Sequence, residues 1–184
     1  MNLSETPQFI TWRLADALPV DLLHRWEAEL ENNPPDQIKR ELWRRIENFI
    51  DAGHGSEILR HPMAARAVQE SLAFNHNRKY RLHNWVVMPN HVHVLLTPIG
   101  GHQLGNIVGP IKSFTSKEIH RLLGGSGPLW QVDYFDRWIR DEKHLGRVAS
   151  YIEWNPVKAK LCQDPVLWPW SSANEAAHSR LEGR

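Results

Sequence analysis

The segment Tyr80–Thr97 reads YRLHNWVVMPNHVHVLLT, and its pattern decides the fold that we expect. Residues 80–88 and 91–97 are both typical of β-strands, because they are rich in β-branched, aromatic and alternating apolar residues. Between them, Pro89-Asn90 is a turn signal. The segment therefore predicts a β-hairpin.

The chain on either side of this hairpin supplies the other elements of the expected core. A strand is predicted before it at 9–14 and a helix at 62–75. After it we expect an amphipathic helix at 103–123 and a strand at 130–140, and the apolar positions of that helix are Leu104, Ile107, Val108, Ile111 and Phe114. The order β-α-β-β-α-β predicts an α+β protein with a ferredoxin-like antiparallel sheet and its helices on one face.

Two segments lie outside this core pattern, and we expect both to belong to the same single domain, 1–184. Residues 15–53 form a helical insertion after the first strand, with helices at 20–31 and 36–50. An added C-terminal helix starts at the N-cap Asp141 and is expected to be limited by Pro156. The remaining tail covers about 162–184.

Composition narrows the class of protein. The 184 residues are 41% hydrophobic and 23% charged, and no apolar run is long enough to span a membrane. One cysteine, Cys162, cannot form an internal disulfide, which favours a cytoplasmic location. The net charge is only +1, but residues 78–160 hold 12 Lys/Arg against 6 Asp/Glu, a local field that attracts phosphate.

The sharpest local feature is the pair His91 and His93 in the second strand of the hairpin. Side chains alternate along a strand, so the two imidazoles project to the same side while Val92 projects into the core. Two neutral imidazoles aimed at one point suit a divalent metal. The alternative is two surface histidines on a half-buried strand, and an isolated H-x-H is weak evidence against it, so this pattern alone leaves both interpretations open.

The second feature lies on the added helix. At about 100° per residue, Tyr151 and Asn155 fall one turn apart on the same edge of the apolar stripe. A tyrosine there can pack its ring and keep its hydroxyl free. The alternatives are a tyrosine at the rim of the core, and an Asn155 that caps a new helix starting at Pro156.

Taken together, five blocks resemble the single-tyrosine HUH transposases, most closely their REP-associated, IS200-like branch. The blocks begin at residues 86, 129, 134, 151 and 168 and read VVMPNHVH, LWQ, YFDR, YIEWNPVKA and WPWSSA. They occur in the family's order. The resemblance implies that His91 and His93 bind Mg²⁺ or Mn²⁺, that Asn155 supplies a third ligand and that Tyr151 is the nucleophile.

The activity implied by this resemblance is cleavage and rejoining of single-stranded or hairpin, REP-like palindromic DNA through a 5′-phosphotyrosine. A metal would neutralise the scissile phosphate, and the covalent link would conserve the bond energy for rejoining. We expect a nucleoid-associated monomer or homodimer. The candidates for phosphate contacts are Lys112, Lys117, Arg121, Arg137, Arg140, Lys158 and Lys160.

Two other functions remain open from the sequence. A catalytically inactive, domesticated regulator that binds hairpin DNA would keep the fold without cutting. A metallohydrolase with H-x-H on a strand would need further His or Asp ligands, and it would form no covalent adduct with DNA. No general base is evident, because His144 lies about 10 Å from Tyr151 along the helix axis.

Overall fold

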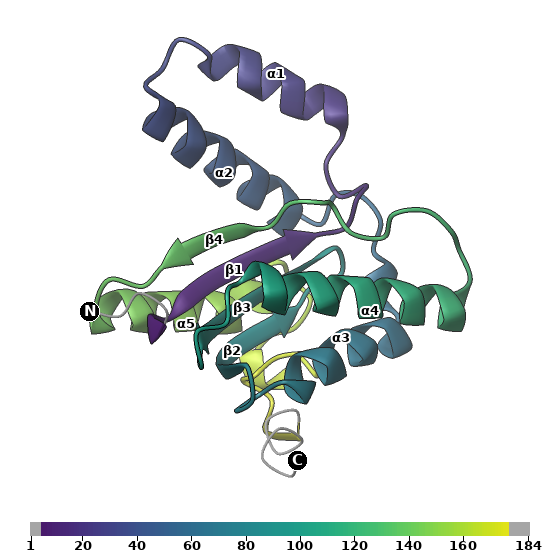
Figure 1. Cartoon of the computed structure of the whole chain (residues 1–184). Helices are drawn as coiled ribbons and strands as arrows, with labels where there is room; N and C mark the ends of the chain where they lie inside the picture. Colours follow the sequence, from purple (N-terminus) through teal and green to yellow (C-terminus); the bar gives the residue numbers. More distant parts are fainter. Residues whose placement is uncertain (1–4, 177–184) are drawn as a thin grey trace.

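The structure is a computed structural model that describes residues 5–176, so the last part of the expected tail, 177–184, lies outside the described residues. Its centre is a four-stranded antiparallel sheet in the order β2-β3-β1-β4 (Figure 1). The strands are β1 (Gln8–Arg13), β2 (Tyr80–Val87), β3 (His91–Pro98) and β4 (Phe135–Trp138). The predicted hairpin is β2–β3, and the ferredoxin-like order is confirmed.

Helices cover both faces of this sheet. Figure 1 shows α3 (Pro62–Phe74) and α4 (Gly105–Leu123), the two helices of the core pattern, side by side on one face. The added helix α5 (Glu142–Lys158) lies on the opposite face. Short 3-10 turns precede α3 at Ile58–Arg60 and follow α5 at Pro165–Leu167. The predicted arrangement, core helices on one face and an added C-terminal helix, is the one observed.

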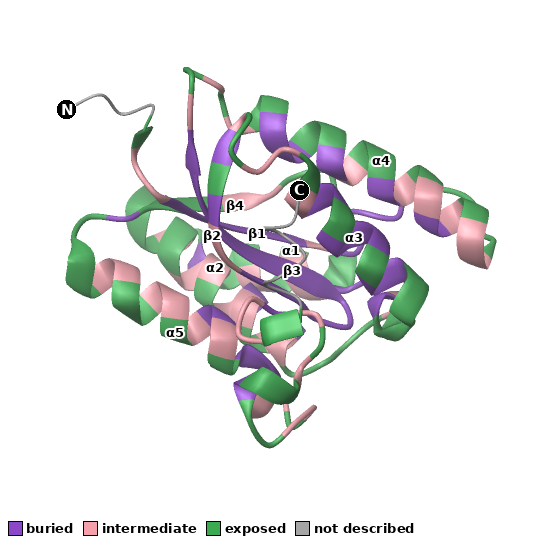
Figure 2. Cartoon of the chain, turned by 90° about the horizontal axis from the view of Figure 1, so that it is seen from below, coloured by how far each residue is buried: buried purple, intermediate pink, exposed green. Residues whose placement is uncertain are grey.

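Strand alternation divides the apolar side chains into two cores. Val92, Val94 and Leu96 of β3 pack with α3 and α4 in the larger core. The smaller core lies between the sheet and α5 and includes Leu95 and Ile152. Figure 2 shows β1 and β3 buried between these layers, while the edge strand β4 and the outer sides of the helices are half-buried or exposed. His91 and His93 therefore face the α5 layer, on the side of the sheet that the sequence assigns to them.

The insertion is a helical hairpin of α1 (Val20–Leu30) and α2 (Pro35–Asp51). In Figure 1, α1 lies farther from the sheet than α2, whose Ile46 and Ile50 are buried in the larger core. The two ends of the insertion meet. Gly55, with φ +87°, approaches so closely that a Cβ there would lie 2.6 Å from Ala17 Cα, so a side chain at this position would collide with backbone. The hairpin thus leaves and re-enters the core at one point.

The segment after α5 covers the outer edge of β2. Val87 N donates to Trp170 O at 2.8 Å, and Ser172 N donates to Trp85 O at 2.9 Å. The indole of Trp168 adds a hydrogen bond to Val87 O at 3.0 Å. Backbone groups of this edge strand are therefore partly paired, which reduces its tendency to associate with other strands.

Three details of the sequence-based prediction are wrong. The strand expected at 130–140 is only Phe135–Trp138, because the carbonyls of residues 131–133 accept hydrogen bonds from the Lys112 ammonium instead of pairing in the sheet. Phe114 is 55% exposed, and the buried stripe of α4 continues through Thr115 and Ile119.

The third error concerns the end of α5. Pro156 does not limit the helix, which continues to Lys158. Proline lacks one N–H donor, but it stands in the last turn, and Pro156 itself is buried against the protein. Asn155 is consequently inside a helix and does not cap a new one.

Among the residues described, no helix combines the length and the apolar character needed to cross a bilayer.

Candidate metal and tyrosine site

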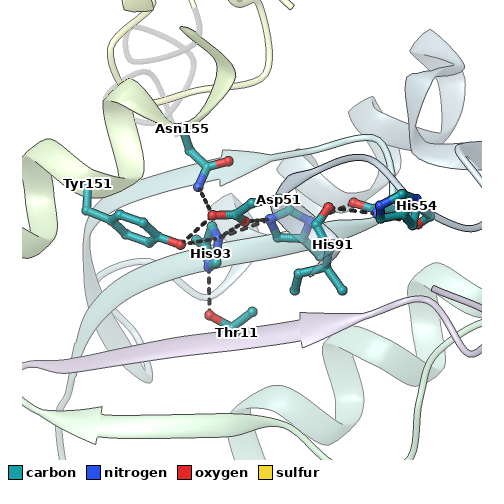
Figure 3. Close-up of polar contacts among 9 residues, drawn as sticks. Thr11, Asp51, His54, His91, His93, Tyr151 and Asn155 are labelled. Atoms are coloured by element: carbon teal, nitrogen blue, oxygen red, sulfur yellow. Dashed lines mark hydrogen bonds and ion pairs between the residues drawn. The ribbon is translucent and has the colours of Figure 1, made fainter. Parts of the chain in front are cut away.

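His91 and His93 are completely buried between β3 and α5, so the interpretation as surface histidines is wrong. Their Nε2 atoms lie 3.0 Å apart (Figure 3). Two ligands at right angles around one ion, each at about 2.1 Å from it, are also about 3.0 Å apart. The pair thus has the separation that a shared octahedral cation requires.

The outer nitrogen of each imidazole is held by a neighbour. Asn90 Oδ1 lies 2.6 Å from His91 Nδ1, and Thr11 Oγ1 lies 2.6 Å from His93 Nδ1. Because an amide oxygen only accepts, His91 Nδ1 carries the hydrogen and the Nε2 of the neutral ring is a free lone pair. Such outer partners fix ring orientation in metal sites.

A third group, Asp51, reaches the same point from the last residue of α2. Its Oδ1 lies 3.2 Å from His91 Nε2 and 3.6 Å from His93 Nε2. Asp51, His91 and His93 each offer one ligand atom, all within 4.8 Å of one another, so this cluster could hold a metal ion. The insertion therefore contributes a carboxylate to the site.

The C-terminal end of α2 is tied to the hairpin that carries the histidines. Asn90 Nδ2 donates to Ile50 O at 3.0 Å and to His54 O at 2.7 Å. The same side chain thus holds His91 with its oxygen and α2 with its nitrogen. This link fixes Asp51 relative to the imidazoles.

Tyr151 and Asn155 bring α5 into the cluster. The Tyr151 hydroxyl donates to Asp51 Oδ2 at 2.9 Å and lies 3.5 Å from His93 Nε2. Asn155 Nδ2 donates to the same Asp51 oxygen at 3.2 Å. The two residues are one turn apart on α5, as the helical wheel predicts, and Figure 3 shows both pointing at Asp51.

Aromatic contacts fix the tyrosine ring. The Phe9 ring stacks on His93 with a centroid distance of 5.4 Å, and its edge meets Tyr151 at 5.9 Å. Lys158 Nζ lies 4.8 Å from the centroid of the Tyr151 ring. The phenol is therefore held beside the imidazoles by packing as well as by hydrogen bonds.

Burial and charge set the protonation of these groups. Burial, assisted by the neighbouring His91, lowers the pKa of His93 to about 4, so its imidazole is neutral at pH 7. Burial alone would raise the pKa of Asp51, but the His91 and His93 side chains outweigh it and hold that pKa below its ordinary value. Neutral imidazoles and an ionised carboxylate are the forms that bind a metal.

The pKa values of Tyr151 and Glu47 are raised, whereas those of His93 and Asp51 are lowered. Burial and the carboxylates of Asp51 and Glu47 raise the pKa of Tyr151 far above its ordinary value. Burial, with a further contribution from the charge of Asp51, raises the pKa of Glu47 to about 7. Glu47 stands one turn before Asp51 on α2, close enough to Tyr151 for the two groups to influence each other's pKa. The tyrosine thus faces two carboxylates of the insertion.

Two buried oxygen atoms give an independent indication of a cation. Asp51 Oδ1 and Asn155 Oδ1 are buried acceptors that receive no hydrogen bond within the described part of the chain. Leaving such a group unpaired costs free energy. These two oxygen atoms and the Nε2 atoms of His91 and His93 are of the kinds that bind a divalent metal, so the residues fit the ion that the sequence predicts.

The candidate phosphate contacts divide between the two faces of the sheet. Lys112, Lys117 and Arg121 lie on α4, on the face opposite the histidines; Lys112 is bound to backbone carbonyls, and Arg121 pairs with Glu118 at 2.6 Å. The other four, which are Arg137, Arg140, Lys158 and Lys160, lie on β4, next to it, or at the end of α5. Only this second group is on the side of Tyr151.

Asp51 and Glu47 are the site residues that sequence reasoning missed. One signal was present: Asp51 is the last residue of an amphipathic helix, where a negative charge opposes the helix dipole and needs another reason to be there. Nothing in the sequence shows that this helix would reach the histidines.

Comparison with known proteins identifies the family. A sequence model with the description "Transposase IS200 like" matches residues 56–155, more than half of the chain. The chain belongs to the IS200-like transposase family. The matched region contains His91, His93, Tyr151 and Asn155, whereas Asp51 and the α1–α2 insertion precede it.

Two known proteins similar to this chain are also transposases. The chain is 29% identical over 97 residues to a REP-associated tyrosine transposase of Escherichia coli (strain K12), a match that covers 52% of this chain and 56% of that protein. The chain thus matches little more than half the length of this relative. It also resembles the solved structure of a REP-associated tyrosine transposase bound to a REP hairpin, with a TM-score of 0.57 and 19% identity over 97% of this chain and 83% of that one. This second likeness shows that the fold is shared.

Proposed function

We propose that this IS200-like transposase is a metal-dependent, single-tyrosine enzyme that nicks and rejoins single-stranded or hairpin DNA through a 5′-phosphotyrosine. The observation that carries the proposal is the 3.5 Å distance between the Tyr151 hydroxyl and His93 Nε2 within one chain. A nucleophile and a metal ligand this close can act on the same phosphate.

The metal of this proposal is Mg²⁺ or Mn²⁺. His91, His93 and Asp51 would hold it, and the unpaired Asn155 Oδ1 is available as a further ligand. When bound, the ion would withdraw charge from the phosphate oxygens and make the phosphorus easier to attack. The family prediction of a third ligand at Asn155 is thus extended by a carboxylate from α2.

Tyr151 performs the covalent step. Its hydroxyl oxygen attacks phosphorus, an oxygen–phosphorus bond to the 5′ side forms, and the bond to the 3′ oxygen breaks and leaves a 3′-hydroxyl after protonation. The tyrosine proton passes to Glu47, whose pKa of about 7 matches a base at neutral pH. Asp51 accepts a hydrogen bond from the same hydroxyl and orients it. Attack by the 3′-hydroxyl on the phosphotyrosine reverses these steps and rejoins the strand.

The substrate of this proposal is DNA with a REP-like palindromic hairpin. The relative of similar fold was solved bound to a REP hairpin. The basic residues near Tyr151, namely Arg137, Arg140, Lys158 and Lys160, are the candidates for holding its phosphates.

Replacing the nucleophile tests the proposal. Tyr151→Phe should abolish Mn²⁺-dependent nicking of a labelled hairpin DNA, and with it the covalent protein–DNA adduct seen after denaturing electrophoresis, while binding measured by fluorescence anisotropy is retained. Tyr134→Phe, at a half-buried tyrosine outside the site, is the matched control and should cut normally.

The outcome also separates the alternatives. Cleavage by the Tyr151→Phe chain would show that another group attacks. Cleavage by the wild type without an adduct would indicate a metallohydrolase that uses water. Hairpin binding without any cleavage by the wild type would indicate a regulator that has lost catalysis.

A further inference from the structure

A basic groove of about 710 Å³ opens between α2, β4 and the start of α5, apart from the metal cluster. One wall is the exposed first half of α2, with Lys39 and Arg40. The opposite wall carries Arg137, Arg140 and Arg147 from β4, the following loop and α5. We call this the α2–α5 groove.

The charge of the α2–α5 groove is positive and available to a ligand. Its lining has five Lys/Arg side chains against three aspartates. One of these aspartates, Asp141, already caps α5 by accepting from His144 N at 2.7 Å. Within residues 5–176, none of the five cations forms an ion pair with a carboxylate. An anion entering the groove therefore displaces no internal partner.

Two aromatic rings are among the residues that line the groove. Trp43 of α2 and Phe135 of β4 stack face to face, with centroids 3.6 Å apart and planes 5° from parallel. Both side chains are half-buried, and Arg137 Cζ lies 5.9 Å from the Phe135 ring. Guanidinium groups beside exposed ring surface are the features with which proteins hold unpaired nucleic acid, since only unpaired bases offer their faces for stacking.

The groove continues from the catalytic residues. On α2, residues 40, 43, 47 and 51 recur at helical spacing, so Arg40 and Trp43 share a face with Glu47 and Asp51. On α5, residues 147, 151 and 155 do the same, so Arg147 lies one turn before Tyr151, about 6 Å along the axis. On β4, Phe135 pairs with Thr11, the residue that holds His93, and shares its face of the sheet.

We propose that the α2–α5 groove binds the single-stranded DNA segment that adjoins the phosphate attacked by Tyr151. The inference rests on the proposed function in taking Tyr151 as the nucleophile. It assigns a role to the insertion: α2 forms one wall of the channel for the unpaired strand, and its arginine and lysine side chains bind the phosphates. A base-paired stem, whose bases already stack on one another, does not offer base faces to these rings.

Charge-removing variants test the groove without disturbing the core. Arg40→Gln/Arg147→Gln changes two exposed side chains on opposite walls. The probes are a short oligothymidine and a blunt hairpin without flanks, and binding is followed by fluorescence anisotropy at several salt concentrations. The variant should bind oligothymidine about tenfold more weakly. The negative slope of log K against log salt should become less steep by about 1.4, which is about 0.7 for each of the two lost phosphate contacts. Binding of the blunt hairpin should not change.

The control is Lys117→Gln/Arg121→Gln on α4, which removes the same charge from the opposite face of the sheet and should leave oligothymidine binding unchanged. Unchanged oligothymidine binding in the groove variant, or an equal loss for both probes, would overturn the inference. The assay needs no cleavage and is run in the Tyr151→Phe background, so a wrong nucleophile leaves its result intact. The same groove substitutions are also made in a chain that keeps Tyr151. If that chain forms the covalent adduct normally and also binds oligothymidine normally, the groove inference is rejected while the proposed function stands.

Discussion

Asp51 is the residue on which most contacts of the site converge. It accepts hydrogen bonds from Tyr151 and Asn155 with one carboxylate oxygen, while the other faces both imidazoles. The neighbouring His91 and His93 hold the pKa of Asp51 below its ordinary value despite burial, so the carboxylate that accepts these two hydrogen bonds is ionised. The other oxygen, Asp51 Oδ1, receives no hydrogen bond within the described residues, because it faces the two imidazole Nε2 atoms.

A prediction for metal binding follows. Asp51→Asn keeps the size of the side chain but removes its charge and one anionic ligand, so Mn²⁺ affinity measured by calorimetry on the DNA-free protein should fall by more than the about 10–100-fold that loss of an outer-shell partner costs. Asp133→Asn, at an exposed aspartate outside the cluster, should bind Mn²⁺ normally. Equal affinity in the two variants would remove Asp51 from the ligand set.

The proposed base gives a prediction for pH. Glu47 can accept a proton only when ionised, and its pKa is about 7, so the wild-type cleavage rate should rise as pH increases through 7. Glu47→Gln should cleave about 10²–10⁴-fold more slowly and lose this rise. A glutamine variant that keeps the wild-type pH profile would assign the proton to another acceptor.

At the scale of elements, the site depends on the link between α2 and the β2–β3 hairpin. The Asn90 side chain is buried, and its amide holds His91 on one side and the end of α2 on the other. Asn90→Ala should lower the free energy of unfolding by about 1–3 kcal/mol, because the carbonyls of Ile50 and His54 lose their donor. It should also weaken Mn²⁺ binding, since both His91 and Asp51 lose their support.

Chemical denaturation and calorimetry measure these two effects. The exposed Asn106→Ala on α4 is the control and should change neither. A loss of stability without any loss of metal affinity would show that Asn90 serves the fold and not the site.

The elements also show how far sequence patterns reach. Alternation along 91–97 places both histidines on one face correctly, and the wheel of α5 places Tyr151 and Asn155 on one edge, because both inferences depend only on local periodicity. Asp51, Glu47 and the Trp43–Phe135 stack depend on where the insertion packs, which periodicity does not determine. The error at Pro156 has the same origin, since tertiary packing of a buried proline offsets a local preference.

At the scale of the whole molecule, one chain supplies every group of the site. His91 and His93 come from β3, Tyr151 and Asn155 from α5, and Asp51 from α2, with the tyrosine 3.5 Å from its own chain's His93. The arrangement needs no second copy to bring Tyr151, the proposed nucleophile, to the histidines.

A mixing experiment tests this arrangement. Equal amounts of Tyr151→Phe and His91→Ala chains should remain inactive on hairpin DNA, because neither chain has a complete site. As a control, wild-type protein is mixed with each variant, which shows whether an inactive chain by itself inhibits cleavage. Recovery of cleavage in the mixture of variants would show that tyrosine and histidines act between chains.

The contact between Gly55 and Ala17 has a consequence for the architecture of shorter proteins of this shape. The α1–α2 insertion begins near Ala17 and ends near Gly55, and these two residues lie side by side. A short loop could therefore replace α1 and α2 without altering the path of β1 or α3. Such a shortened chain would retain the imidazole pair, the phenol and the amide, but it would have to recruit its carboxylate from another source. Gly55 thus marks the point at which the insertion, with its proposed carboxylate ligand, joins the rest of the fold.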